Sequence, residues 1–466
     1  MPRPLDLHPD RLFPAEPNVR DIARALYEEV KGAPIVSPHG HTDPLWFALN
    51  EPFGNATELL LQPDHYLFRM LYSQGVRLED LGIGNADADP REAWRIFADH
   101  YYLYRGTPSR IWCDWVFSEV FGLDVRLESS TADLYYDTIT DALATDAMRP
   151  RALFDRFGIE FLATTEGALD PLEHHAAIRA SDWQGRVVTT YRPDAVIDPE
   201  FEGFADNLAE FGKLTGEDTL SWQGYLAAHR QRRQFFKHHG ATASDHGHEY
   251  PVTANLSGSE AEALFDRIKG GEASAEDAAL FRGQMLTEMA RMSLDDGLTM
   301  QVHCGCYRNH NTGVYERFGR DKGADMPLAV DFVHGLKPML DAVGNEPDLT
   351  IILFTLDEDT YARELAPLAG HYPCLKLGPA WWFHDSPEGM RRFRRMTTET
   401  AGFYNTVGFN DDTRAFLSIP ARHDLARRID CGFLAELVAE HRLTEDEAHE
   451  VAQDLAVNLV RQAYKL

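Results

Sequence analysis

Two histidines separated by one glycine, His39 and His41, follow the short apolar run Ile35-Val36. Because side chains alternate along a β-strand, residues two apart project to the same side, and both imidazoles could bind one metal ion. The chain holds 20 histidines among 466 residues, so such a triplet is expected about once by accident. A second triplet, His246-Gly247-His248, is indeed present. The spacing alone is therefore a weak signal, and the position of the triplet has to decide.

An aspartate near the other end of the chain, Asp412, supports the metal interpretation. It follows the last of the apolar runs, 406–409, whereas His39 and His41 follow the first. In a closed barrel the first and last strands are neighbours, so the carboxylate can join the two imidazoles. Two imidazoles and one carboxylate leave positions open for water or substrate, as a catalytic divalent site requires. The alternative is that the histidines only form hydrogen bonds in a polar cluster.

A single histidine, His303, follows another apolar run at 298–302. In a closed barrel this fifth strand end lies across the mouth from the first. His303 is then either a further metal ligand or a hydrogen-bonding group for the substrate, and we favour the substrate role. The alternative is a buried structural histidine.

The elements that must position these residues are eight short apolar or β-branched runs, each followed by polar residues and separated by stretches of helical period. Strands that alternate with helices imply parallel pairing. Eight such units with functional residues at the strand ends predict an α/β fold, a (β/α)8 TIM barrel. The predicted strands are 35–36, 159–163, 187–191, 241–243, 298–302, 350–355, 374–377 and 406–409.

The length of 466 residues fits one domain, 1–466, because barrels with insertions reach this size. The connection 43–157, after the first strand, is too long for a crossover helix. It contains helical segments at 91–104 and 132–147, so we expect a large helical insertion that forms a subdomain over the barrel mouth.

Two further segments are predicted to be helical. The connection 194–239 is a second helical insertion, and the tail 433–466 forms C-terminal helices. Within the tail, Thr444 and Glu447 have the spacing of a capping box, which marks a helix start.

The composition limits the partners and the compartment. Acidic residues outnumber basic ones by 74 to 45, giving a net charge of −29, which repels nucleic acid and anionic membranes. Five cysteines without paired spacing indicate a reducing compartment. Charges and prolines in the segment 1–14 exclude a signal peptide, so we expect a cytoplasmic protein. An anionic substrate would need local arginines to overcome the net field.

Seven segments spread over nearly the whole chain form a further pattern. They are Ser37-Pro38-His39-Gly40-His41, Asp64-His65-Tyr66-Leu67-Phe68-Arg69, Tyr191-Arg192-Pro193-Asp194, Ser244-Asp245-His246-Gly247, His303 with Arg308-Asn309, Gly378-Pro379-Ala380-Trp381-Trp382-Phe383 and Asp412-Thr413-Arg414-Ala415-Phe416-Leu417-Ser418. Together and in this order, they resemble the uronate isomerase (glucuronate isomerase) family of the amidohydrolase superfamily, although Ser37-Pro38 departs from the Asp-Tyr pair usual there.

The resemblance implies a barrel of the metal-dependent hydrolase type with one divalent metal ion, zinc or manganese, held by His39, His41 and Asp412. It implies an aldose–ketose isomerase that converts D-glucuronate to D-fructuronate, or D-galacturonate to D-tagaturonate, with catalytic roles for Asp412, Tyr66 and His65. We expect Asp412 to carry the proton between C2 and C1 through a cis-enediol, with Tyr66 assisting at a hydroxyl. The alternative for the Asp64 to Tyr66 run is an ordinary helix start with Asp64 as N-cap.

A hexuronate also needs groups that bind its carboxylate and its ring carbons. Arginine binds a carboxylate bidentately, and Arg192, Arg308 and Arg414 each follow a predicted strand end. Trp381 offers an apolar wall for C–H groups. We therefore expect these four residues and His303 to bind a small-molecule hexuronate.

Two other functions remain open. A metal-dependent hydrolase of the amidohydrolase superfamily could use the same ligands to activate water, and a non-catalytic sugar-acid-binding protein would need no metal. We expect a homo-oligomer with no nucleic-acid or membrane partner.

Overall fold

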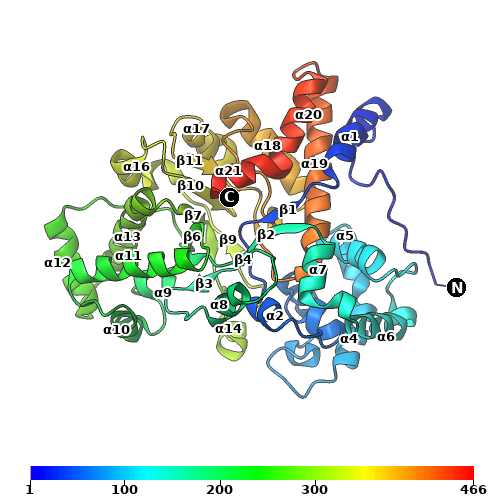
Figure 1. Ribbon diagram of the computed structural model, residues 1–466, viewed down its shortest axis with the longest axis horizontal. Coiled ribbons are helices and arrows are strands. Elements are labelled where there is room, and N and C mark those ends of the chain that lie inside the picture. Colours follow the sequence, from blue (N-terminus) through cyan, green and yellow to red (C-terminus); the bar gives the residue numbers. More distant parts are fainter. Residues whose placement is uncertain (1) are drawn as a thin grey trace.

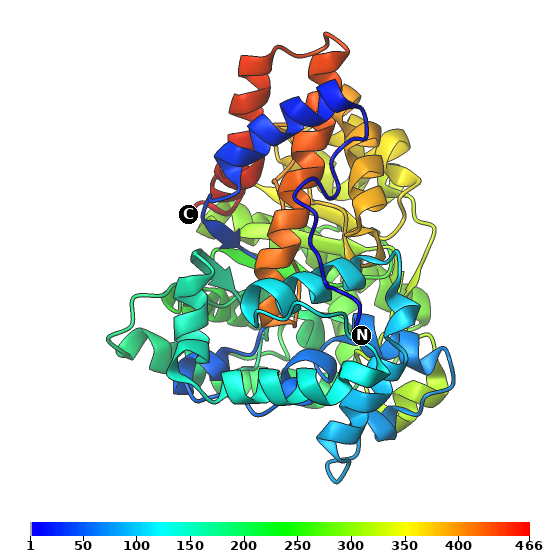
Figure 2. The ribbon, with the colours of Figure 1, turned by 90° about the vertical axis from the view of Figure 1, so that its right-hand side faces the viewer.

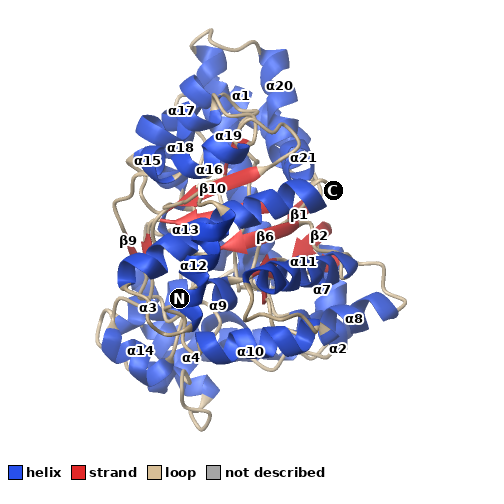
Figure 3. Cartoon of the chain, turned by 90° about the vertical axis from the view of Figure 1, so that its left-hand side faces the viewer, coloured by secondary structure: helices blue, strands red, loops and turns tan. Residues whose placement is uncertain are grey.

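Short, buried strands form the centre of the molecule, surrounded by helices (Figure 1). The computed structural model describes residues 2–466. β1 (Ile35–Ser37), β7 (Thr299–Cys304) and β10 (Ile351–Thr355) are buried at every position. Burial on both faces is typical of parallel strands covered by helices, and Figure 3 shows helices on both sides of the strands.

The strands pair in parallel, in the orders β1-β2-β4 and β11-β10-β7-β6-β5-β3. The remaining strands of these two sheets are β2 (Ile159–Ala163), β3 (Glu166–Gly167), β4 (Val187–Val188), β5 (Tyr191–Arg192), β6 (Ala243–His246) and β11 (Leu375–Leu377). The break between the sheets is bridged by backbone hydrogen bonds, from Thr164 N to Val188 O at 2.9 Å and from Glu166 N to Thr190 O at 3.2 Å. The two sheets are thus continuous, and the protein is an α/β protein with a parallel sheet.

The prediction of a strand at 406–409 is wrong, because the structure has no strand there. Thr406 forms only an isolated parallel bridge with Leu377, and Val407 N donates to Leu377 O at 3.1 Å. Gly408 has φ +74°, which lies outside the β region, so the regular extended conformation ends there. Further along, His41 N donates to Thr413 O at 3.0 Å. The segment after Thr406 therefore lies between β11 and β1 but forms no ladder.

The strand predicted at 241–243 is displaced towards its polar residues. β6 includes Ser244, Asp245 and His246, all of them buried. The prediction missed these three residues because it searched for runs of apolar residues. The structure also adds an antiparallel pair that was not predicted, β8 (Cys306–Tyr307) with β9 (Met326–Pro327).

The segment between β1 and β2 is largely helical, and its apolar side chains form most of a separate hydrophobic cluster. Side chains that accept a backbone N–H cap several of its helices at the first turn, as Asp43, Asp64, Asp89 and Thr107 do, which fixes where each begins. The helices are α2 (Pro44–Leu49), α3 (His65–Tyr72), α4 (Pro90–Asp99), α5 (Pro108–Trp115), α6 (Ala132–Leu143) and α7 (Pro150–Arg156).

The other helices follow the later strands. They are α8 (Glu173–Ala180), α9 (Asp194–Ile197), α10 (Phe204–Thr215), α11 (Trp222–His238), α12 (Gly258–Lys269), α13 (Ala275–Asp296), α14 (Thr312–Phe318), α15 (Phe332–Gly335), α16 (Lys337–Val343), α17 (Ala366–Ala369) and α18 (Pro387–Ala401). Within 2–466, no helix combines the length and apolarity that a membrane span needs.

The C-terminal helices begin earlier than predicted, at Ile419 rather than at residue 433. They are α19 (Ile419–Ala439), α20 (Glu445–Gln453) and α21 (Leu459–Tyr464). α19 is buried along most of its length and therefore lacks the one-sided pattern that reveals a surface helix. The predicted capping box of Thr444 and Glu447 is confirmed. Figure 2 shows α19 and α20 beside α1 (Pro17–Val30). The start of α19 reaches the helices between β1 and β2, where Arg422 lies over the ring of Trp112 in α5.

Candidate active site

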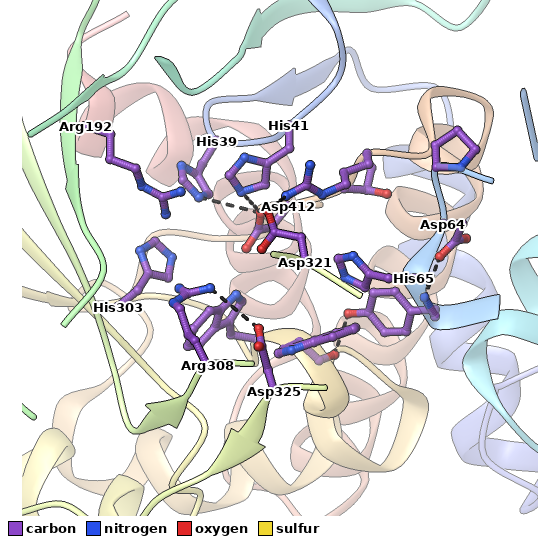
Figure 4. Close-up of a pocket in the computed structure, with 16 residues that line it drawn as sticks. His39, His41, Asp64, His65, Arg192, His303, Arg308, Asp321, Asp325 and Asp412 are labelled. Atoms are coloured by element: carbon purple, nitrogen blue, oxygen red, sulfur yellow. Dashed lines mark hydrogen bonds and ion pairs between the residues drawn. The ribbon is translucent and has the colours of Figure 1, made fainter. Parts of the chain in front are cut away.

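One pocket at the ends of the strands brings together every site residue predicted from the sequence (Figure 4). The predicted residues that line it are His39, His41, His65, Tyr66, Arg192, His303, Arg308, Trp381, Asp412 and Arg414. The others are Pro63, Asp64, Asp321, Asp325, Trp382 and Thr413.

The predicted metal ligands converge in this pocket. Oδ1 of Asp412 lies 3.1 Å from Nε2 of His41 and 3.6 Å from Nε2 of His39. Burial lowers the pKa of His39 to about 3 and also lowers that of His41, so both rings are neutral at pH 7. Neutral imidazole and ionised carboxylate are the ligating forms. The donor set therefore fits a divalent ion of the zinc type.

His303 lies close to these proposed ligands, although we expected it to bind the substrate rather than the metal. His39, His303 and Asp412 each offer a ligand atom within 4.8 Å of the other two. Nδ1 of His303 contacts Oδ1 of Asp245 at 2.6 Å, which leaves Nε2 as the acceptor nitrogen. This Nε2 is buried and has no hydrogen-bond partner among residues 2–466. It is available either to a metal ion or to a substrate hydroxyl.

Aromatic stacking fixes the His303 ring. The ring stacks on Phe354 with centroids 4.2 Å apart and on His39 at 4.8 Å, and Trp381 meets its edge at 4.8 Å. A Cβ atom on Gly378 would lie 2.4 Å from the Phe354 ring. Glycine at this position thus allows Phe354 to support the histidine.

Each predicted carboxylate-binding arginine is already near an aspartate. Guanidinium-to-carboxylate distances are 2.6 Å for Arg192 with Asp245, 2.8 Å for Arg414 with Asp321 and 3.6 Å for Arg308 with Asp325. The pocket is therefore less positive than three arginines alone would make it. Arg308 has the longest of these contacts, so its guanidinium is the least committed.

The first turn of α3 carries His65 and Tyr66 to the pocket wall. The Asp64 side chain accepts the Tyr66 N–H at 2.9 Å, so the helix-start interpretation of this run is correct. The same residues also line the pocket. Burial lowers the pKa of His65 to about 3, which leaves this ring uncharged.

The Tyr66 hydroxyl is held by two acceptors, Trp382 O at 2.7 Å and Oδ2 of Asp385 at 2.9 Å. Arg422 donates to the same Oδ2 at 2.7 Å. Burial raises the pKa of Asp385 to about 7, against the opposing charge of Arg422. Burial and Asp385 hold the pKa of Tyr66 well above its usual value, so the phenol is protonated at neutral pH.

Several pocket residues have a left-handed backbone, which non-glycine residues rarely adopt. The φ angles are +60° at Asp321, +51° at Trp382 and +38° at Asp412. Strained backbone of this kind concentrates at functional sites, where the surrounding structure holds it in place.

Some residues in the pocket and behind its wall were not predicted from the sequence. Asp321 and Asp325 lie on the connection between α14 and β9, and Asp385 and Arg422 support Tyr66 from behind. None follows a predicted strand end, so the pattern contained no signal for them.

A parallel α/β fold with a candidate metal site of imidazole and carboxylate groups at its strand ends is an arrangement of metal-dependent enzymes. The glucuronate isomerase family model matches residues 18–464, and the chain belongs to this family. The uronate isomerase of Sphingopyxis alaskensis is 71% identical over 470 residues, covering 100% of both chains. The crystal structure of glucuronate isomerase from Caulobacter crescentus has a TM-score of 0.98 at 64% identity, covering 99% of this chain and 98% of that one. The uronate isomerase structure from Thermotoga maritima has a TM-score of 0.92 at 25% identity, covering 98% of this chain and 99% of that one.

Proposed function

We propose that this protein is a uronate isomerase that interconverts D-glucuronate and D-fructuronate, and D-galacturonate and D-tagaturonate. The observation that carries this proposal is a single pocket in which a metal-type ligand cluster faces three arginines. The cluster suits carbonyl and hydroxyl oxygens, and the arginines suit a carboxylate. Family membership supports the same activity.

We propose a (β/α)8 barrel of the metal-dependent hydrolase type as the scaffold, in one domain of residues 1–466. The parallel order of the strands and the hydrogen bond from His41 N to Thr413 O support closure between the first and last strands. The insertions 43–157 and 194–239 then lie on the catalytic face, where α3 already contributes to the pocket.

His39, His41 and Asp412 would hold the divalent ion, which we propose to be zinc, with manganese as the alternative. When bound, such an ion polarises the C1 carbonyl and the C2 hydroxyl of an open-chain uronate. His303 accepts a hydrogen bond from a substrate hydroxyl through Nε2. The test is the metal content of a His39→Ala/His41→Ala protein, which should lose the ion of this site.

Asp412 accepts the proton from C2 and returns it to C1, and the cis-enediol lies between these two steps. Its carboxylate is ionised at neutral pH: burial opposes ionisation, but His39 and His41 hold its pKa far below the usual value. Tyr66, protonated and hydrogen-bonded to Asp385, supplies a proton to a sugar oxygen, and His65 lines the same side of the pocket.

Arg192, Arg308 and Arg414 orient the C6 carboxylate, and Trp381 packs on the C–H face of the chain. Arg308 lies over the Trp381 ring, 5.8 Å from its centroid. The charged and apolar groups proposed to bind the substrate are therefore adjacent. A substrate fixed at both ends presents the C1–C2 edge to Asp412, and this positioning lowers the barrier.

The decisive experiment incubates the protein with D-glucuronate and with D-galacturonate and follows ketose formation. Ketose without any change of mass supports the isomerase. Release of an amine or an acid would instead identify a metal-dependent hydrolase, and binding without turnover after metal is supplied would identify a sugar-acid-binding protein.

We also propose a cytoplasmic location, which the five free cysteines support. The homo-oligomer stays a prediction, and sedimentation velocity would measure it.

A further inference from the structure

A second group of converging ligand atoms lies beside the pocket, at the ends of β5 and β6. His246 is the last residue of β6, His248 follows two residues later, and Asp194 is the first residue of α9. Because Tyr191 of β5 pairs with Ser244 of β6, these strand ends are neighbours. One atom from each of the three side chains lies within 4.8 Å of the other two.

The two imidazoles have unused nitrogens. Nδ1 of His246 and Nε2 of His248 are buried and lack a hydrogen-bond partner in the described part of the chain. The residues are 0% and 7% exposed, and their rings lie nearly parallel, with centroids 6.4 Å apart. Buried polar atoms almost always have partners, so two unpartnered nitrogens beside one carboxylate indicate a missing occupant.

The atoms that remain free favour a cation as that occupant. The hydroxyl of Ser244 contacts Nε2 of His246 at 3.2 Å, which leaves Nδ1 as the free nitrogen. Asp194 accepts the Gly247 N–H at 3.3 Å through each of its oxygens and has no proton to donate when ionised.

The arginine that contacts Asp194 does not fill this role. Arg192 approaches Asp194 only at 3.6 Å through Nε, while its Nη2 is bound to Asp245 at 2.6 Å. Arg192 therefore partly balances the charge of Asp194. Within residues 2–466, it forms no hydrogen bond with either free imidazole nitrogen.

We propose that His246, His248 and Asp194 bind a second divalent transition-metal ion, separate from the one assigned to His39, His41 and Asp412. Two imidazoles and a carboxylate are ligands that zinc accepts. The ion ties the end of β6 to the start of α9 and so fixes Asp194 beside Arg192. Its role is structural, and the proposal does not depend on the isomerase activity. The second His-x-His triplet, weak as a sequence signal, gains a third ligand in the fold.

The test is the zinc stoichiometry of metal-free protein, titrated in competition with a chromophoric chelator. Wild-type protein should bind two equivalents, and both His248→Gln and His39→Ala/His41→Ala should bind one. Asp194→Asn should weaken one of the two equivalents at least about tenfold, because a charged ligand becomes neutral. The matched control is His239→Gln, a histidine 9% exposed and bonded to Phe235 O, which should keep both equivalents.

A second measurement covers variants that fail to fold. Cobalt added to the His39→Ala/His41→Ala protein should give visible absorption bands that come only from the site of His246, His248 and Asp194. The triple variant that also carries His248→Gln should lack these bands. The proposal is overturned if wild-type protein binds one equivalent that is lost in His39→Ala/His41→Ala, which would mean that water fills the cluster. It is equally overturned if folded His248→Gln protein retains two.

Discussion

At the scale of single residues, the pocket combines groups that the sequence reveals with groups that it hides. The ten predicted residues line one pocket because most follow strand ends, which parallel pairing brings to one side. Asp321, Asp325 and Asp385 could not be predicted, since their arginine partners are chosen by tertiary packing. Conversely, the sequence could not tell how close His303 lies to His39 and Asp412.

Asp412→Asn tests the proton carrier. The amide keeps the size of the side chain but cannot accept the C2 proton, so kcat should fall by several orders of magnitude while uronate binding persists. Exchange of the C2 proton into deuterated solvent should disappear as well. Wild-type exchange with metal still bound would transfer the role to Tyr66 or His303.

At the scale of elements, the connection between α14 and β9 restrains two of the arginines that we propose to bind the substrate. It places Asp321, which is 45% exposed at its side chain, against Arg414 at 2.8 Å, and Asp325 near Arg308. If Arg414 binds the uronate carboxylate as proposed, that carboxylate would compete with Asp321.

Asp321→Asn should therefore lower KM for D-glucuronate, by about two- to tenfold, because the competing charge is removed. The value of kcat should change less. Steady-state kinetics of the variant beside Asp331→Asn, an exposed aspartate outside the pocket, give the comparison. A raised KM would show that Asp321 orders Arg414 for binding.

β3 carries a partly buried acid, Glu166, whose ionisation opposes folding. Burial raises the pKa of Glu166 to about 7, so the folded state binds this proton more strongly than the unfolded state does. The free energy of unfolding therefore falls as the pH rises from about 4.5 to about 7 and stays low above that range. Glu166→Gln should remove this fall.

At pH 8 the Glu166→Gln protein should exceed the wild type in stability by about 1–3 kcal/mol relative to their difference at pH 4.5. Thermal melting at both pH values measures this effect. Glu173→Gln, 64% exposed at its side chain, is the control and should follow the wild type. If the stability of all three proteins changes equally between pH 4.5 and pH 8, folding does not hinder the ionisation of Glu166.

The elements themselves were predictable where apolar residues run together. The ends of β1, β2, β7, β10 and β11 lie within two residues of their predicted positions. The pattern failed at β6, whose polar residues bind one another inside the fold, and at 406–409, where Gly408 ends the extended backbone. It missed the start of α19 because a helix buried on most sides carries no amphipathic signal.

At the scale of the whole molecule, the net charge of −29 surrounds a site proposed for an anion. Salt screens this long-range repulsion within about 10 Å at 0.1 M, whereas contacts inside the pocket are screened less. Association should therefore improve with salt, in contrast to enzymes whose field attracts the substrate.

We expect kcat/KM for D-glucuronate to rise about two- to threefold between roughly 10 and 200 mM NaCl, with kcat nearly constant. Initial rates at low and saturating substrate separate the two quantities. A decrease in kcat/KM would mean that the arginines dominate the field at the pocket entrance.

The seam between β1 and the segment after Thr406 has a consequence for the dynamics of the fold. Here the backbone contributes one hydrogen bond, from His41 N to Thr413 O, where neighbouring strands have ladders. The proposed ligands straddle the seam, with His39 and His41 on one side and Asp412 on the other. An ion held by all three would act as a clasp, so metal affinity and the opening free energy of the seam should be linked. Chelation should speed amide hydrogen exchange at residues 39–41 and 411–414 while leaving β7 and β10 protected.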